Sequence, residues 1–147
     1  MDSLIKSLET VLADTYSLFL KTQNYHWNVE GCCFKENHEM FENQYKDLFE
    51  AMDECAELIR GLGSKVNGTF VAFSKNTQIK DGDGSKSSNE MIMDLANDQI
   101  AIEKSLKTAF KEAQAVEDEV ITGFLATRMT IHRKNAWMLN SSVCKKK

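Results

Sequence analysis

Apolar side chains recur at helical spacing along most of the chain, and glycines divide this pattern into long segments. Glycine punctuates helices and rarely lies inside them, and the seven glycines leave uninterrupted pieces at residues 1–30, 32–60, 85–122 and 124–147. Apolar residues repeat every three or four positions in these pieces, beginning with Leu4, Leu8 and Leu12, as expected for amphipathic helices. The pattern predicts four long helices, the last of which begins near Val116.

Polar residues mark the expected starts of the last two helices. Ser87 or Ser88 can cap the third helix, and Glu90 can complete a capping box there. The acidic run at 117–119 falls in the first turn of the fourth helix, where the helix dipole favours negative charge.

Four amphipathic helices without a convincing strand predict an all-α fold, a four-helix bundle. Residues 61–86 must then join the second and third helices, and about 25 residues are too many for a tight helix hairpin. They fit the long crossover that ferritin-like bundles use. The apolar patch at 70–73 is expected to pack on the bundle, and residues 74–88 are expected to form a solvent loop.

Length and composition fit a single domain spanning residues 1–147. Hydrophobic side chains make up 42% and charged side chains 27% of the 147 residues, which is ordinary for a chain that buries its own core. A net charge of −4 gives no reason to expect nucleic acid on the body of the protein. The N-terminal segment lacks a signal-peptide pattern, and no apolar run approaches a membrane span. The expected location is the cytoplasm, without a membrane partner.

The four cysteines, Cys32, Cys33, Cys55 and Cys144, show no Cys-x-x-Cys spacing. Adjacent Cys32 and Cys33 are poorly placed to ligate one zinc ion together. All four are expected to be free thiols in a reducing cytoplasm.

Two of the three histidines, His26 and His38, flank a turn in the stretch NYHWNVEGCCFKENHEMFE at residues 24–42. At about 100° per residue, His38, Glu42, Asp53 and Glu57 of the second helix lie at about 0°, 40°, 60° and 100° and share one face. A carboxylate there borders the apolar stripe and is costly unless it is paired or binds a cation. The face is a candidate metal site, although such acidic residues more often form a solvated face and such histidines more often cap or pack.

Spacing along the helix axis constrains this site. The 11 positions from Glu42 to Asp53 cover roughly 16 Å, whereas metal–ligand distances are about 2–2.5 Å. One chain therefore cannot hold one metal with both pairs, but an antiparallel copy of the helix in a two-fold partner can, and two-fold symmetry then gives two identical sites. His26 could complete each site. Imidazoles and carboxylates with open positions suit iron(II) better than structural zinc.

The sequence also argues against the di-iron site that ordinary ferritins build inside one subunit from Glu-x-x-His motifs. Gln23, Lys35 and Met129 stand three residues before the three histidines, so no such motif exists.

Four motifs carry a resemblance to a known family. NYHWNVEG, F-x3-H-E-M-F-E and D-E-x-A-E-x-I-R-x-L-G follow one another through the first two helices, and R-x3-H-R-K-x2-W-M-L lies in the last. In this order and spacing they resemble the Dps family (DNA-protection-during-starvation proteins, or mini-ferritins) of the ferritin-like superfamily. By position, His26, His38, Asp53 and Glu57 resemble the family's iron ligands, and Glu42 stands where the family commonly has an acidic residue.

The resemblance implies a function and an assembly. Members of the family form hollow dodecamers and place the iron site between two-fold-related subunits. They act as ferroxidases in the response to oxidative stress: they oxidise iron(II), usually with hydrogen peroxide, and store iron(III) mineral inside. This implies iron as the bound metal, iron(II) and peroxide as substrates, and protection of DNA as the outcome.

The chain departs from the family's pattern at three points, one of which is the absence of the Pro often found beyond the L-G at 62–63. Leu58 stands where the family usually has an Arg that is expected to support the site through a salt bridge, and Gly123 replaces an acidic residue of the ion-pore region. The run at 117–119 could still line such a pore, with dipole capping as the alternative.

Three other residues near these motifs are expected to be structural. His132 lies in a basic segment of the last helix and is interpreted as a structural or surface residue and not as a ligand. Trp27 and Tyr45 could quench radicals, but as aromatics at helical positions they are expected in the core.

DNA is a second partner of some family members, which bind it through flexible basic tails. This chain has almost no N-terminal extension and ends in CKKK, a short basic tail at 143–147. Repeated over many subunits, the tail could gain avidity for phosphate; otherwise it is a solubilising end. The alternative functions are thus a DNA-compacting, nucleoid-associated protein, or a metal-free bundle whose acidic face meets another protein.

Overall fold

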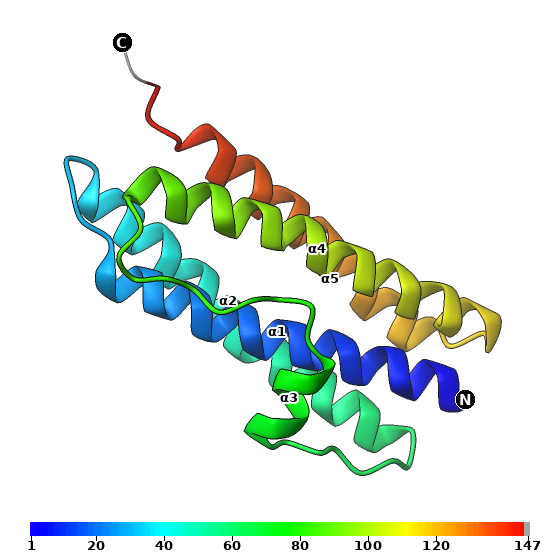
Figure 1. Cartoon of the computed structure of the whole chain (residues 1–147). Coiled ribbons are helices and arrows are strands. Elements are labelled where there is room, and N and C mark those ends of the chain that lie inside the picture. Colours follow the sequence, from blue (N-terminus) through cyan, green and yellow to red (C-terminus); the bar gives the residue numbers. More distant parts are fainter. Residues whose placement is uncertain (146–147) are drawn as a thin grey trace.

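The protein is described here by a computed structural model that covers residues 1–145, and these residues form five helices and no strand. α1 (Asp2–Asn28) pairs with α2 (Phe34–Gly61), and α4 (Ser88–Ala115) pairs with α5 (Glu119–Ser141). Figure 1 shows the two helical hairpins stacked into one bundle, with α1 against α4. The predicted all-α, ferritin-like bundle with a long crossover is confirmed.

One apolar core fills the space between the two hairpins. All four long helices contribute side chains that are fully removed from solvent, which is what their helical spacing predicts. The largest of them include Tyr25, Phe41, Leu4, Leu8, Leu18, Leu48, Ile59, Met91, Ile92, Leu95, Ile102 and Leu106.

The predicted cap of α4 is confirmed, whereas α5 begins later than predicted. The Ser87 side chain accepts a hydrogen bond from the backbone N–H of Glu90 at 3.3 Å and caps α4. Asp118 caps α5 in the same way, accepting from the N–H of Ile121 at 2.9 Å. α5 begins at Glu119 and not near Val116, because α4 continues to Ala115 and Glu117 takes a left-handed φ of 55° in the turn.

The crossover between α2 and α4 runs along α1 and contains a short helix, α3 (Phe70–Asn76), that the sequence did not predict. A buried carboxylate holds its far end. Asp14 of α1 accepts hydrogen bonds from the Thr77 hydroxyl at 2.9 Å, the Gln78 N–H at 2.7 Å and the Ser105 hydroxyl of α4 at 2.6 Å. Because a buried carboxylate needs such donors, this contact fixes the crossover against both helices.

Two expectations about burial are wrong in part. In the patch at 70–73, Phe73 packs against the Tyr16 ring with a centroid distance of 4.8 Å, but Phe70 is 81% and Val71 62% exposed. α3 touches α1 with one face only, so its other face stays outside the core. Trp27 is 63% exposed and is not a core residue. It lies one position beyond buried His26, where the α1 surface turns away from the bundle.

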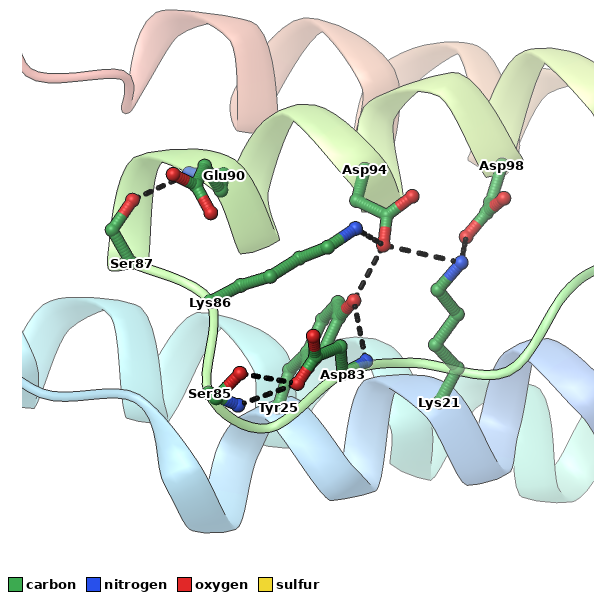
Figure 2. A network of polar contacts seen from close by, with 9 residues as sticks. All are labelled: Lys21, Tyr25, Asp83, Ser85, Lys86, Ser87, Glu90, Asp94 and Asp98. Carbon is green, nitrogen blue, oxygen red and sulfur yellow. Dashed lines mark hydrogen bonds and ion pairs between the residues drawn. The ribbon is translucent and has the colours of Figure 1, made fainter.

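A polar network between α1 and α4 fastens the end of α1 (Figure 2). Lys21, only 4% exposed, forms ion pairs with Asp98 at 2.8 Å and Asp94 at 3.3 Å. The Tyr25 hydroxyl donates a hydrogen bond to Asp94. Burial raises the pKa of Asp98 despite Lys21. Burial acts in the same direction on Asp94, but Tyr25 and Lys21 together hold its pKa below the usual value.

The crossover adds two further contacts to this network. The N–H of Asp83 donates to the Tyr25 hydroxyl at 3.2 Å, and Lys86 forms an ion pair with Asp94 at 3.2 Å. Gly82 allows this approach, because a Cβ there would lie 2.9 Å from the Tyr25 ring. Burial and the Asp94 acceptor raise the pKa of Tyr25, so the hydroxyl keeps its proton and remains a donor. Tyr25, the residue before His26, is thereby held by Asp94 of α4 and by Asp83 of the crossover.

The predicted basic tail falls partly outside the described residues. Lys145 is exposed, and Lys146 and Lys147 of the predicted tail lie outside the described residues. The hypothesis of DNA binding through the tail stays a prediction.

Candidate metal centre

The turn between α1 and α2 brings His26 and His38 into direct contact. Gly31 adopts a φ of 116° in this turn, a backbone conformation that favours glycine. The two imidazole rings stack with a centroid distance of 3.7 Å and an interplanar angle of 16°. The turn therefore makes one pair of two residues that stand 12 positions apart in the sequence. His26 is buried and His38 is half-buried.

The two histidines hold each other through the main chain. His26 Nδ1 lies 2.8 Å from the carbonyl oxygen of His38, and His38 Nδ1 lies 2.7 Å from the carbonyl oxygen of His26. A carbonyl only accepts, so each Nδ1 carries the proton and donates it. In the neutral rings both Nε2 atoms are then left as lone-pair donors, the arrangement that orients metal-binding histidines.

Aromatic rings enclose this pair. Tyr45 packs edge-on against the His26 ring at 5.1 Å, and the Phe34 ring lies 5.0 Å from that of His38. Tyr45 is half-buried and also contacts Phe19 at 5.9 Å. It therefore packs against neighbouring rings at the edge of the bundle and is not the core residue that was expected. These rings pack around the imidazoles but form no hydrogen bond with them.

The predicted carboxylates do not join the histidines within the subunit. Glu42 is half-buried and pairs with Lys46 at 3.4 Å, whereas Asp53 and Glu57 are exposed farther along α2. Within residues 1–145, no side-chain hydrogen bond or ion pair engages either of these two. The five predicted ligands form no metal-sized cluster in the described chain.

His132 belongs to a different, structural arrangement. Its Nδ1 donates to the Gln99 side-chain oxygen at 2.6 Å, and its Nε2 accepts from Arg128 at 3.3 Å. Arg128 in turn makes two hydrogen bonds to the carboxylate of Asp47, at 3.1 and 2.8 Å. The chain of contacts joins α4, α5 and α2, and both ring nitrogens are occupied. The structural interpretation is confirmed. Leu58, at the departure from the family's pattern, packs partly buried against the core.

Acidification is expected to destabilise the fold through His132. Burial and the neighbouring Arg128 lower its pKa from 6.5 to about 3. Between these values the unfolded chain binds a proton that the folded chain excludes, so stability is full above the ordinary pKa and falls as pH decreases. From about pH 7.5 to about pH 5 the expected loss is about 2 kcal/mol in the free energy of unfolding.

Denaturant titrations at fixed protein concentration across this pH range would measure the loss. His132→Gln is expected to flatten the pH dependence by the same amount. An unchanged slope in the variant would assign it to other groups.

One cluster was not predictable from the sequence, in which adjacent Cys32 and Cys33 were expected to be poorly placed for binding one zinc ion together. Cys32, Cys33 and Cys144 place their sulfur atoms within 4.8 Å of one another, and no other group in residues 1–145 gathers three metal-ligating side chains so closely. The thiols are free, as predicted. Contacts with the Cys144 and Cys32 thiols raise the pKa of Cys33 to about 11. Chain spacing gave no signal of this cluster, because Cys144 lies 111 positions beyond Cys33.

None of the helices is both long and apolar enough to cross a lipid bilayer, as judged over the part of the chain that the structure describes.

Comparison with known proteins gives concordant matches. The family profile described as Ferritin-like domain matches residues 5–145. A DNA protection during starvation protein of Brevibacillus brevis is 31% identical over 134 residues, covering 91% of this chain and 90% of that protein. An uncharacterized low temperature-induced protein of Nostoc is 32% identical, covering 95% of this chain and 79% of that protein.

Solved structures agree with the sequence matches. The crystal structure of Dps from Staphylococcus aureus has a TM-score of 0.94 at 27% identity and covers 99% of this chain and 98% of that one. A Dps protein from Vibrio cholerae, described as a member of a broad superfamily of ferritin-like diiron-carboxylate proteins, has a TM-score of 0.91 at 28% identity, covering 95% and 88%.

Proposed function

Because this chain belongs to the Dps family of ferritin-like proteins, we propose that it is a cytoplasmic iron-storage and detoxification protein. It oxidises iron(II), preferably with hydrogen peroxide, at sites shared by two-fold-related subunits. It stores the iron(III) mineral in the cavity of a dodecamer and so protects DNA from oxidative damage.

The observation that carries this proposal is the histidine pair. Both Nδ1 atoms are committed to main-chain carbonyls at 2.8 and 2.7 Å, so both Nε2 atoms are available to a metal. Two histidines that served only to pack the structure would not need a free Nε2 atom on both rings. Neutral imidazole is the form that binds iron(II).

The remaining ligands come from Asp53 and Glu57 of the partner subunit. Roughly 16 Å of helix separates the two ends of the constellation, which argues against a site within one chain. Exposed apolar side chains on the same hairpin support a subunit contact there: Leu20 and Trp27 of α1 and Phe49 of α2 are all exposed. Large exposed apolar surface of this kind marks interfaces.

The donor set suits the proposed reaction. Imidazole nitrogens favour iron(II), while the carboxylates tolerate its change to iron(III), and Glu42 assists as a ligand or hydrogen-bond acceptor. Two iron(II) ions each lose one electron, and one hydrogen peroxide takes both electrons with two protons and leaves as two waters. The reaction consumes both reagents that produce hydroxyl radicals.

Iron titration tests the proposal. The metal-free assembly would be titrated anaerobically with iron(II), then given a peroxide pulse and followed by ultraviolet absorbance. Two-fold symmetry predicts one shared site per subunit. Asp53→Ala is expected to lose the fast oxidation phase.

Glu39→Ala is the matched control. Glu39 is an exposed carboxylate of α2 that only approaches Lys35, at 3.9 Å, and its removal is expected to leave oxidation unchanged. If all three proteins oxidise iron no faster than buffer, the acidic face is structural and the proposal is wrong.

A further inference from the structure

Three chain segments that are distant in sequence meet at one end of the bundle. The α1–α2 turn, the start of α4 and the segment after α5 lie together there in Figure 1. The turn supplies Cys32 and Cys33, and the segment after α5 supplies Cys144. The iron site proposed above uses none of these residues.

The sulfur atoms have the separations that a metal ion requires. Cys33 Sγ lies 3.8 Å from Cys32 Sγ and 3.8 Å from Cys144 Sγ. With metal–sulfur bonds of about 2.3 Å, a three-coordinate planar centre needs sulfur atoms about 4.0 Å apart. The third pair, within 4.8 Å, would have to close by about 0.8 Å at most to meet that spacing. Small side-chain rotations of exposed Cys32 and Cys144 can supply this.

Asn89 holds the remote cysteine in place. The N–H of Cys144 donates to Asn89 Oδ1 at 2.9 Å, and Asn89 Nδ2 donates to the Cys144 carbonyl at 2.9 Å. Two reciprocal hydrogen bonds dock the main chain of the segment after α5 on the first turn of α4. The third sulfur is therefore positioned by the fold and does not depend on chance contact.

The donor set indicates which metal fits. The cluster contains three thiols and no imidazole or carboxylate within the described residues. Soft sulfur donors select thiophilic cations, whereas structural zinc is almost always held by four ligands. A disulfide would use only two of the sulfurs, and their 3.8 Å separation would have to shrink to about 2.05 Å.

We propose that Cys32, Cys33 and Cys144 form a binding site for Cu(I), separate from the iron site, with Asn89 as a positioning residue. Each cysteine binds as a thiolate and releases one proton to solvent when the metal enters. No electron transfer is involved.

Competition for Cu(I) tests the site. The reduced, full-length assembly would be titrated anaerobically with Cu(I) against a chromogenic Cu(I) chelator. Wild type is expected to retain one Cu(I) per subunit, and X-ray absorption is expected to show sulfur neighbours only. Cys144→Ser is expected to lower the affinity by more than about 100-fold, and Asn89→Ala by about 10-fold with sulfur coordination retained.

Cys55→Ala is the matched control, because Cys55 is a fully buried thiol that lies outside the cluster. Its affinity for Cu(I) is expected to equal that of wild type, as is that of His38→Ala. Equal affinity in wild type and Cys144→Ser would overturn the proposal. So would loss of copper in His38→Ala alone, displacement of Cu(I) by equimolar zinc, or a Cys33–Cys144 disulfide in place of copper binding.

Discussion

Replacing His38 with alanine is expected to lower the rate of fast iron(II) oxidation by more than about 100-fold. The substitution removes one imidazole and also the Nδ1–H that His38 donates to the His26 carbonyl at 2.7 Å. The stacked His26 ring, 3.7 Å away, loses its support as well. Stopped-flow absorbance after a peroxide pulse would measure the rate. Helical content and oligomer size should stay unchanged, since the substitution leaves the core intact.

Mixed assemblies sharpen this prediction. A dimer of one His38→Ala and one Asp53→Ala subunit has both defects in one shared site and none in the other. Random mixing makes half of the dimers mixed, with one subunit of each variant. One of the two sites in each mixed dimer is intact, so about one quarter of all sites are intact. Unfolding and reassembling an equal mixture should therefore recover about one quarter of the wild-type amplitude. No recovery would show that His38 and Asp53 act within the same subunit.

Replacing Lys21 with methionine is expected to lower the free energy of unfolding by about 3–5 kcal/mol near neutral pH. The Lys21 side chain is 4% exposed, and its ammonium group pairs with Asp98 at 2.8 Å and Asp94 at 3.3 Å. Methionine keeps much of the volume but leaves two partly buried carboxylates facing each other, with Lys86 paired to only one of them. The loss should shrink in acid, because burial already raises the pKa of Asp98 and a protonated Asp98 carries no unpaired charge.

Lys107→Met is the control for this prediction. Lys107 pairs with Glu103 at 3.1 Å but is itself 55% exposed, and Glu103 keeps a second partner in Arg133 at 2.7 Å. The Lys107 pair is therefore expected to contribute only about 0–1 kcal/mol. Denaturation of both variants by guanidinium chloride at one protein concentration would compare their losses in the free energy of unfolding. Equal losses would mean that burial adds nothing to the Lys21 pairs.

The long helices were predictable because each has an uninterrupted apolar stripe, and Ser87 marks a start that local hydrogen bonding alone explains. α3 was not, because seven residues of helix carry too little periodicity to detect. Trp27 was misassigned because apolar character does not show whether a helix position faces the core or the outer surface.

The candidate site was likewise predictable from the sequence only in part. The turn and its two histidines are local in sequence, so spacing indicated that His26 and His38 could meet. Which nitrogen stays free depends on main-chain carbonyl directions, which only coordinates provide. Cys144 joins the turn through the packing of α5 and the Asn89 contact, and both are tertiary.

The main-chain anchoring of the two imidazoles affects how this protein tolerates mutation. Carbonyl oxygens are present whatever side chain a residue carries, so no substitution elsewhere can delete the groups that orient His26 and His38. A histidine pair held by neighbouring side chains would accumulate losses as those neighbours drifted. Here the orientation of the imidazoles is inherited with the backbone turn, and leucine at position 58 does not disturb it.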